Sequence, residues 1–527
     1  MLMDPQQSQI SLPSALKATQ ENKGRRNARS RSMFEWQSNP SSSTCCIDLS
    51  LQPSLSSNNL SDDSETHTLK GPVNEKNELY EHRLFLLRLC KSLVACGAPA
   101  HRLDHCVQCI RKKLTISADF GYFSGFLVVS FGDPESLATS VQLIKVDSGL
   151  DLYRLTRVYE VFQSVMCDEI DVQDASAALV PILHDKPFYA PWITLVAHAI
   201  ASSASIPLFF FGTALDMLIG LGLGLIVALG TIHVSRRVTR FSSIFDVLLS
   251  AVVGFLSAIV SARLPSSSTC FYALSVGGVV NLLPGYATLI SLLEISAGSV
   301  ATGTLRLTTT LVYSLLIGFG LALGASIHEL LFPSLALIPS SAACENKLPV
   351  SFHILLVPIF AAANIVLQNG HPSKYPIMLG LAILSRAVHY ISLQKFVAYP
   401  HVATVLAAFA VAIASNIYAR LKATIGFVDM ITGLLFLVPG SVGVASSLNT
   451  FGQALSSSSP TTEVSVILNA GQQGIIFAAH MMVIAVSVSV GLVLAAVVIY
   501  PVRKLTGRRG GAVYRYKKKD WVGEITF

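Results

Sequence analysis

Long apolar stretches dominate the chain from residue 190 onward. Each is close in length to the roughly 20 apolar residues with which a helix crosses about 30 Å of hydrocarbon. The shorter alternating segments that are typical of barrel strands do not occur. The pattern predicts a polytopic α-helical membrane protein with about ten transmembrane helices, at residues 190–211, 213–232, 244–262, 270–293, 308–332, 350–367, 374–393, 401–419, 425–446 and 475–500.

Residues 79–189 carry the shorter patterns of a globular domain. Leucines recur at helical spacing up to Gly97, and a second helix is expected after Pro99. Three β-type runs and two further helical patterns follow, at residues 114–120, 125–131, 139–146, 150–162 and 172–183. We therefore expect a small α+β domain before the first membrane helix. Residues 1–78 are rich in Ser, Asn and Gln, and we expect them to be a disordered tail because they cannot bury enough apolar surface.

Charge is distributed as unevenly as hydrophobicity. Within residues 190–500, 18 of 311 side chains are Asp, Glu, Lys or Arg, against 51 of the other 216. The 13% charge of the whole chain therefore averages a membrane part and an ordinary polar part, which excludes both a single water-soluble core and a single-pass receptor. Its net charge of +7 is expected to reflect topology and attraction to anionic lipid rather than nucleic-acid binding.

The positive charges predict the orientation in the membrane. With ten spans and a cytosolic amino end, the cytosolic connections and the basic tail at 501–527 hold 15 Lys and Arg, and the opposite connections hold 3. This bias follows the positive-inside rule and predicts that both termini and the α+β domain are cytosolic. Seven of the nine cysteines lie before the first span, where thiols stay reduced. Cys270 and Cys344 fall at connections expected on the other side, where a bridge is allowed but has no further support.

Two motifs occur twice in the membrane part. The pattern Gly-x5-Pro-Gly in the fourth span, with Pro284 and Gly285, returns 155 residues later in the ninth span, with Pro439 and Gly440. A shorter match between the third and eighth spans has an offset of 154 residues. The repeat divides the membrane part into two halves of five spans, 190–332 and 333–500. Because five is odd, the second half enters the membrane from the opposite side, which predicts a five-plus-five inverted repeat.

Paired Gly/Pro breaks have a functional meaning in transporters built from inverted repeats. Proline lacks an N–H and glycine lets the chain bend, so backbone amides and carbonyls become free near the middle of the bilayer. Such groups suit the carboxylate and the ammonium of an amino acid; the alternative is a pair of packing kinks. The expected substrate-binding residues are Asn281, Pro284, Gly285, Pro439, Gly440 and Ser441.

Charged side chains inside the spans are costly and therefore candidates for function. Glu294 is the first choice for a proton-coupling carboxylate, and Asp429 is the second. Arg386 in the seventh span is expected to form a gating ion pair with a carboxylate such as Asp216. The alternative for each of these residues is a structural hydrogen bond between helices.

Several of these residues belong to longer motifs that resemble the threonine/serine exporter family, which includes fungal pheromone-regulated membrane proteins. The resemblance covers roughly residues 80–500 and implies secondary transport of small hydroxy amino acids, with export driven by protons in bacterial members. The Ser-rich amino tail, Arg386 and the basic carboxyl tail depart from a minimal bacterial exporter and leave substrate and direction open. The matching segments are Gly97 to Asp104, Gly149 to Leu152, Asp168 to Ile170, Asn281 to Tyr286, Ser291 to Glu294, His371-Pro372 and Val438 to Ser441.

The leading hypothesis is a secondary active transporter, a proton-coupled exporter of small amino acids such as threonine and serine. The alternative is a non-transporting membrane protein in signalling or mating whose cytosolic domain recruits partners. A third interpretation, an intramembrane hydrolase using Ser441 or His480, lacks a matched base and oxyanion donors. We therefore expect no enzyme.

The expected ligands follow from this class. No Walker motif for an ATP motor occurs, and Cys106-x2-Cys109 has no second ligand pair, so we expect no cofactor and no metal. The expected partners are an amino acid, protons and membrane lipids, and not nucleic acid. A homo-oligomer and the organelle, either the plasma or the vacuolar membrane, stay open.

Overall fold

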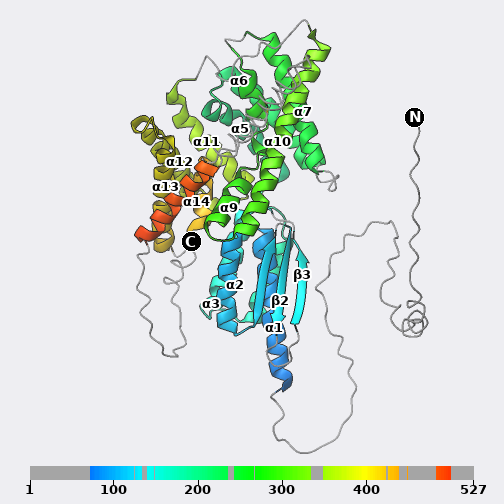
Figure 1. Cartoon of the computed structure of the whole chain (residues 1–527), viewed down its shortest axis with the longest axis vertical. Coiled ribbons are helices and arrows are strands. Elements are labelled where there is room, and N and C mark those ends of the chain that lie inside the picture. The colour runs from blue at the N-terminus through cyan, green and yellow to red at the C-terminus, as the bar shows by residue number, and fades with distance from the viewer. Residues whose placement is uncertain are drawn as a thin grey trace, which may run out of the picture. The chain divides into compact units, whose positions relative to one another are not determined.

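The structure is a computed structural model of the whole chain (Figure 1). The described residues are 72–123, 125–132, 139–146, 149–234, 242–265, 268–333, 348–422, 425–437, 448 and 482–499. Most of the expected amino tail and the whole carboxyl tail lie outside these residues. The expected division of the chain into a tail, an α+β domain and two membrane halves stays a prediction.

The α+β domain contains the elements that the sequence pattern predicts, with boundaries that differ by a few residues. Three strands form an antiparallel sheet in the order β1-β2-β3, with Ala118 opposite Phe131 and Val129 opposite Gln142. Along β2, Leu127, Val129 and Phe131 alternate into the domain core because successive side chains of a strand point to opposite faces. The elements are α1 (Pro72–Ala95), α2 (Ala100–Leu114), β1 (Ala118–Phe123), β2 (Phe126–Gly132), β3 (Thr139–Lys145), α3 (Leu152–Met166) and α4 (Val172–His184).

The remaining described chain is helical and apolar. Seven described helices are long and apolar enough to cross a membrane, or eight if the bent pair α8 and α9 is one span. The chain is therefore a polytopic α-helical protein, and the total of ten spans stays a prediction. The helices are α5 (Pro191–Phe209), α6 (Ala214–Leu229), α7 (Ser242–Arg263), α8 (Phe271–Gly278), α9 (Gly285–Ser296), α10 (Val300–Leu331), α11 (His353–Leu367), α12 (Tyr375–Lys395), α13 (Pro400–Lys422), α14 (Gly426–Leu435) and an unlabelled helix, Met482–Ile499.

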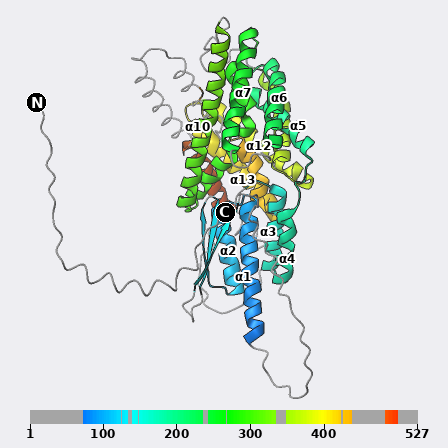
Figure 2. The same ribbon diagram turned by 90° about the vertical axis from the view of Figure 1, so that its right-hand side faces the viewer.

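Small residues allow the membrane helices to approach closely, as is typical of helix packing in lipid. The α7–α10 pair makes the most extensive helix contact, and the two helices run side by side in Figures 1 and 2. A Cβ atom at Gly254 of α7 would overlap the carbonyl of Leu321, and one at Gly324 of α10 would overlap the carbonyl of Ala251. Large apolar side chains such as Leu330 and Ile354 are 81% exposed, which fits helices whose outer faces meet lipid.

Helix α10 is longer than the hydropathy pattern predicts. The apolar window begins at residue 308, whereas the helix begins at Val300 and has 32 residues. At 1.5 Å per residue it is about 48 Å long, more than the roughly 30 Å of a hydrocarbon core. Its extra first turns contact the α+β domain: the Thr302 hydroxyl donates to the carbonyl of Tyr122 on β1, at 2.9 Å.

Candidate functional site

The fourth span is broken at the Pro-Gly pair, as predicted. Helix α8 ends at Gly278, a short 3-10 turn covers Val280–Leu282, and α9 begins at Gly285 after Pro284. The two parts of the span are bent by 42°. Proline at this position has no N–H to give to the preceding turn, which weakens the helix here. Helices α5 and α11 continue through Pro207 and Pro358, so the Pro-Gly pair favours the break but proline alone does not cause it.

Asn281 holds the break against helix α5. Its side-chain nitrogen donates to the carbonyl of His198 at 2.9 Å and to the Ser202 hydroxyl at 3.1 Å. The amide donors of Asn281 are therefore already used within the protein. This contact gives Asn281 a positioning role next to Pro284.

A cavity of about 290 Å³ adjoins the break. Two loops of the α+β domain form one wall, and the start of α9 and the first turns of α10 form the others. Pro284 lines this cavity, whereas Asn281 and Gly285 are not among its lining residues. The lining residues are Gly97, Ala98, Gly149, Leu150, Pro284, Tyr286, Ala287, Arg306, Thr309, Thr310 and Tyr313.

The loop at Gly97 has a backbone that only glycine adopts readily. Its φ is +88°, and a Cβ atom there would lie 2.6 Å from the carbonyl oxygen of Gly149, the other domain loop of the cavity. The Tyr286 hydroxyl of α9 donates to the carbonyl of Gly97 at 2.5 Å. The two loops and the broken span are therefore packed together at the cavity wall.

Glu294 and Arg306 form a buried ion pair next to the cavity. Their side chains are 0% and 13% exposed, and an Arg306 nitrogen lies 3.0 Å from Oε1 of Glu294. The same oxygen accepts the backbone N–H of Ala100 at 2.8 Å, and Arg306 also donates to the Tyr122 hydroxyl at 3.0 Å. Ala100 is the first residue of α2, so the positive end of a helix dipole faces the carboxylate. Oε2 of Glu294 has no hydrogen-bond partner among the described residues.

A second buried, paired carboxylate lies on α14. Asp429 on α14 is 0% exposed, and its two oxygens lie 2.9 Å and 3.3 Å from the ammonium of Lys374, just before α12. The guanidinium of Arg102 on α2 lies 4.1 Å from the ring centre of Phe427, close to Asp429 on α14. The expected partners in the ninth span, Pro439, Gly440 and Ser441, lie outside the described residues.

The expected ion pair of Arg386 with Asp216 is not formed among the described residues. Asp216 closes a capping box with Thr213 at the start of α6 and accepts the backbone N–H of Cys270 at 3.2 Å. Arg386 donates to the carbonyl of Leu208 at 3.2 Å. Asp216 therefore caps the amino-terminal end of α6. The spacing Thr213-x2-Asp216 in the sequence indicates that role.

Sequence patterns missed both cations of the buried pairs. Arg306 and Lys374 counted as ordinary loop charges, because each lies at the edge of an apolar window. The hydroxyl of Tyr122 was missed because it comes from a strand of the other domain. In the described part of the chain, no three His, Cys, Asp or Glu side chains are placed to hold a metal ion.

Comparison with known proteins shows which proteins the chain is similar to. Residues 84–328 match the family model described as "Putative threonine/serine exporter", which agrees with the resemblance predicted from the motifs. Over 82% of its length the chain is 30% identical to "Pheromone-regulated membrane protein 10" of Eremothecium gossypii and of Kluyveromyces lactis, covering 58% and 45% of those proteins. It is 29% identical to an uncharacterized Schizosaccharomyces pombe protein, of which it covers 57%. The chain thus spans about half the length of these relatives. No solved structure matches.

Proposed function

Because residues 84–328 belong to the threonine/serine exporter family, we propose that the chain is a secondary active transporter that exports small amino acids such as threonine and serine in exchange for protons. The observation that carries the proposal is the cavity at the broken fourth span, beside the buried pair of Glu294 and Arg306. A broken helix beside a cavity is a common substrate site of such carriers.

The size and chemistry of the cavity suit a small hydroxy amino acid. Its volume of about 290 Å³ is at the lower limit of the range for ligand pockets, roughly 300–1,000 Å³. The hydroxyls of Thr309, Thr310 and Tyr313 already donate to Leu305, Leu307 and Asp246. Their oxygens keep lone pairs that accept hydrogen bonds from an ammonium or a hydroxyl group.

The α+β domain is proposed to close the cavity on the cytosolic side. Its loops at Gly97 and Gly149 line the cavity, so substrate cannot leave on that side unless they move. The side assignment is supported by the cysteines: Cys90, Cys96 and Cys106 of the domain are free, whereas Cys270, at the start of α8, is disulfide-bonded. Thiols stay reduced in the cytosol, and disulfides form outside it.

Asp429 with Lys374 is the second candidate for proton coupling. Like Glu294, Asp429 is a fully buried carboxylate on a membrane helix that faces the domain. A buried carboxylate that exchanges a proton against a cation is the usual way a carrier couples flux to pH.

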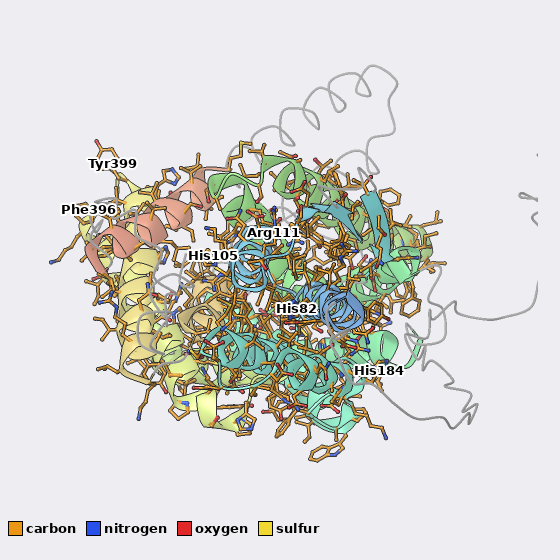
Figure 3. The ribbon with its side chains drawn as sticks, turned by 90° about the horizontal axis from the view of Figure 1, so that it is seen from below. His82, His105, Arg111, His184, Phe396 and Tyr399 are labelled. Atoms are coloured by element: carbon orange, nitrogen blue, oxygen red, sulfur yellow. The ribbon has the colours of Figure 1, made fainter. Side chains whose placement is uncertain are left out.

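Flux measurements test the proposal. The purified full chain is reconstituted in vesicles, and uptake and efflux of labelled threonine and serine are measured with and without a pH gradient. We expect gradient-driven flux, at least tenfold lower in Glu294→Gln and reduced in Pro284→Ala. Arg111→Gln is the matched control, because Arg111 lies on the surface of α2 and its ion pair among the described residues is with the exposed Asp119 (Figure 3). Absence of flux for any amino acid, with or without the pH gradient, would contradict the proposal and favour a signalling protein.

A further inference from the structure

The pair of Glu294 and Arg306 has the charges of an amino acid in reverse. An α-amino acid carries a carboxylate and an ammonium two bonds apart, and the pair presents a guanidinium and a carboxylate at ion-pair distance, 3.0 Å. Arg306 lines the cavity, so a solute in the cavity reaches its free donors first. Glu294 lies directly behind it, fully buried.

Glu294 still has an unused acceptor. Oε1 receives both Arg306 and the N–H of Ala100, whereas Oε2 is buried without a partner among the described residues. A buried carboxylate oxygen without a donor is costly, because it has lost its hydration without gaining a hydrogen bond. A ligand ammonium beside Oε2 would remove that cost.

The other groups around Glu294 do not replace Arg306. On the elements packed against this part of α9, the titratable and charged groups are Tyr286 on α9 itself, Arg306 and Tyr313 on α10, His101 and Arg102 on α2, Tyr122 on β1 and Asp429 on α14. Burial and the neighbouring Arg102 lower the pKa of His101 to about 3, so His101 is neutral at physiological pH. Arg102 faces Phe427 instead. Among the described residues, Arg306 is the cation within ion-pair distance of Glu294.

We propose that Glu294 and Arg306 together are a receptor for zwitterionic α-amino acids: the substrate inserts into the pair, its carboxylate binding Arg306 and its ammonium binding Glu294. This inference rests on the proposed transport function and names the two side chains that bind the charges of the substrate. One ion pair is replaced by two, so no charge is left buried alone. Arginine suits this role because its planar guanidinium holds a carboxylate while it keeps a second contact, here the Tyr122 hydroxyl.

The same arrangement explains why the carrier would exchange its substrate for protons. A proton on Glu294 neutralises the group that binds the ammonium, so proton and amino acid compete for one carboxylate. A carrier in which they compete moves them in opposite directions, which is what export driven by an inward proton gradient requires. The proton that displaces the substrate leaves on the cytosolic side when the next amino acid arrives.

Analogues of threonine test the receptor in the unmodified protein. Exchange of labelled threonine in vesicles with the full chain is inhibited with unlabelled threonine, with threoninamide, which has only the ammonium, and with lactate, which has only the carboxylate. We expect threoninamide and lactate to inhibit at least about tenfold more weakly than threonine. Equal inhibition by threonine and either analogue overturns the receptor but leaves transport intact, whereas absence of threonine flux overturns both proposals.

Two variants locate the recognition. In Glu294→Gln the threonine and lactate inhibition constants are expected to converge to within about threefold, because the ammonium has lost its partner. The double variant Arg306→Gln with Glu294→Gln leaves no unpaired charge and is expected to lose the preference for carboxylates as well. Arg111→Gln is the control that keeps both preferences. Unchanged analogue preferences in a folded double variant would overturn the assignment.

Discussion

Two of the buried carboxylates of the membrane part are each paired with a basic side chain, but their surroundings differ. Glu294 on α9 and Asp429 on α14 are both fully buried, and each pairs with one basic side chain. Glu294 also receives the N–H of Ala100 from the α+β domain, and its partner Arg306 lines a cavity. Asp429 has both oxygens on Lys374 and no other hydrogen-bond donor among the described residues.

This difference bears on which of the two ion pairs can separate to admit a ligand. A carboxylate with a second donor and an adjacent cavity can exchange its cation for a ligand without being left alone. A carboxylate that depends on a single lysine loses its one partner when it does so. Glu294 is therefore our first candidate for an exchanging site, and Asp429, which also bonds α14 to the segment just before α12, is the second.

The α+β domain also contacts the two halves differently. At the first half it uses side chains of the membrane helices: Tyr286 and Thr302 donate to the carbonyls of Gly97 and Tyr122. At the second half, the backbone N–H groups of Leu152 and Tyr153 donate to the carbonyls after α11, and the Asn369 side chain donates to Asp151 at 3.3 Å. Substitution of single side chains can therefore remove the hydrogen bonds between the domain and the first half one at a time.

The largest expected effect is at Asp429. Lys374→Met removes its cation, and breaking a buried pair from one side costs about 3–5 kcal/mol. Arg306→Met is expected to cost less, because Glu294 keeps the Ala100 N–H. Thermal unfolding of both variants in detergent measures the difference.

The double variant Lys374→Met with Asp429→Leu is the control for this prediction. It replaces the pair by apolar groups and is expected to recover most of the lost stability, since such replacements are often neutral. Equal destabilisation by Lys374→Met and Arg306→Met would contradict the comparison of the two pairs.

The second-largest expected effect concerns the hydrogen bond from the backbone N–H of Ala100 to Glu294, which has no counterpart at Asp429 among the described residues. Ala100→Pro removes the N–H that reaches Glu294, yet proline is favoured at the first position of a helix, and Pro99 before it is already extended. Loss of a hydrogen bond to a charged group is expected to cost about 1.5–3 kcal/mol. The measurement is thermal unfolding together with threonine exchange.

Ala100→Gly is the matched control, because it keeps the backbone N–H and adds no atoms to this buried position, and it is expected to cost about 1 kcal/mol or less. If Ala100→Pro unfolds at the native temperature and exchanges threonine at the native rate, the α2 N-terminus does not support Glu294.

How far the sequence predicts this molecule depends on the range of the interactions. The break at Pro284 and the strands of the domain follow from local chemistry, a Pro-Gly pair and alternating side chains, and were predicted. The capping box of Asp216 is equally local, and its spacing favours a helix start over the ion pair with Arg386 that was predicted.

Arg306 shows where local patterns end. Its pairing with Glu294 depends on the turn between α9 and α10, and its bond to Tyr122 depends on a strand more than 180 residues away. The hydropathy pattern starts this span at residue 308 and so leaves Arg306 outside it. An apolar window carries no information about a domain that docks against the end of a helix. The structure was therefore needed to find the site, although the helices that form it were predicted from the sequence.

The smallest expected effect tests the docking of the first half. Thr302 is buried and donates to the Tyr122 carbonyl, whereas Thr304, two residues along α10, is exposed and donates only to carbonyls of its own helix. Thr302→Val leaves the strand carbonyl without this donor and is expected to destabilise the protein by about 1 kcal/mol. Thr304→Val makes the same chemical change at the surface and is expected to stay within about 0.5 kcal/mol of the native protein. Because both residues lie in the first turns of α10, a difference in their unfolding temperatures reports the domain contact alone. Equal unfolding temperatures would mean that this side-chain bond adds nothing to the docking of the first half.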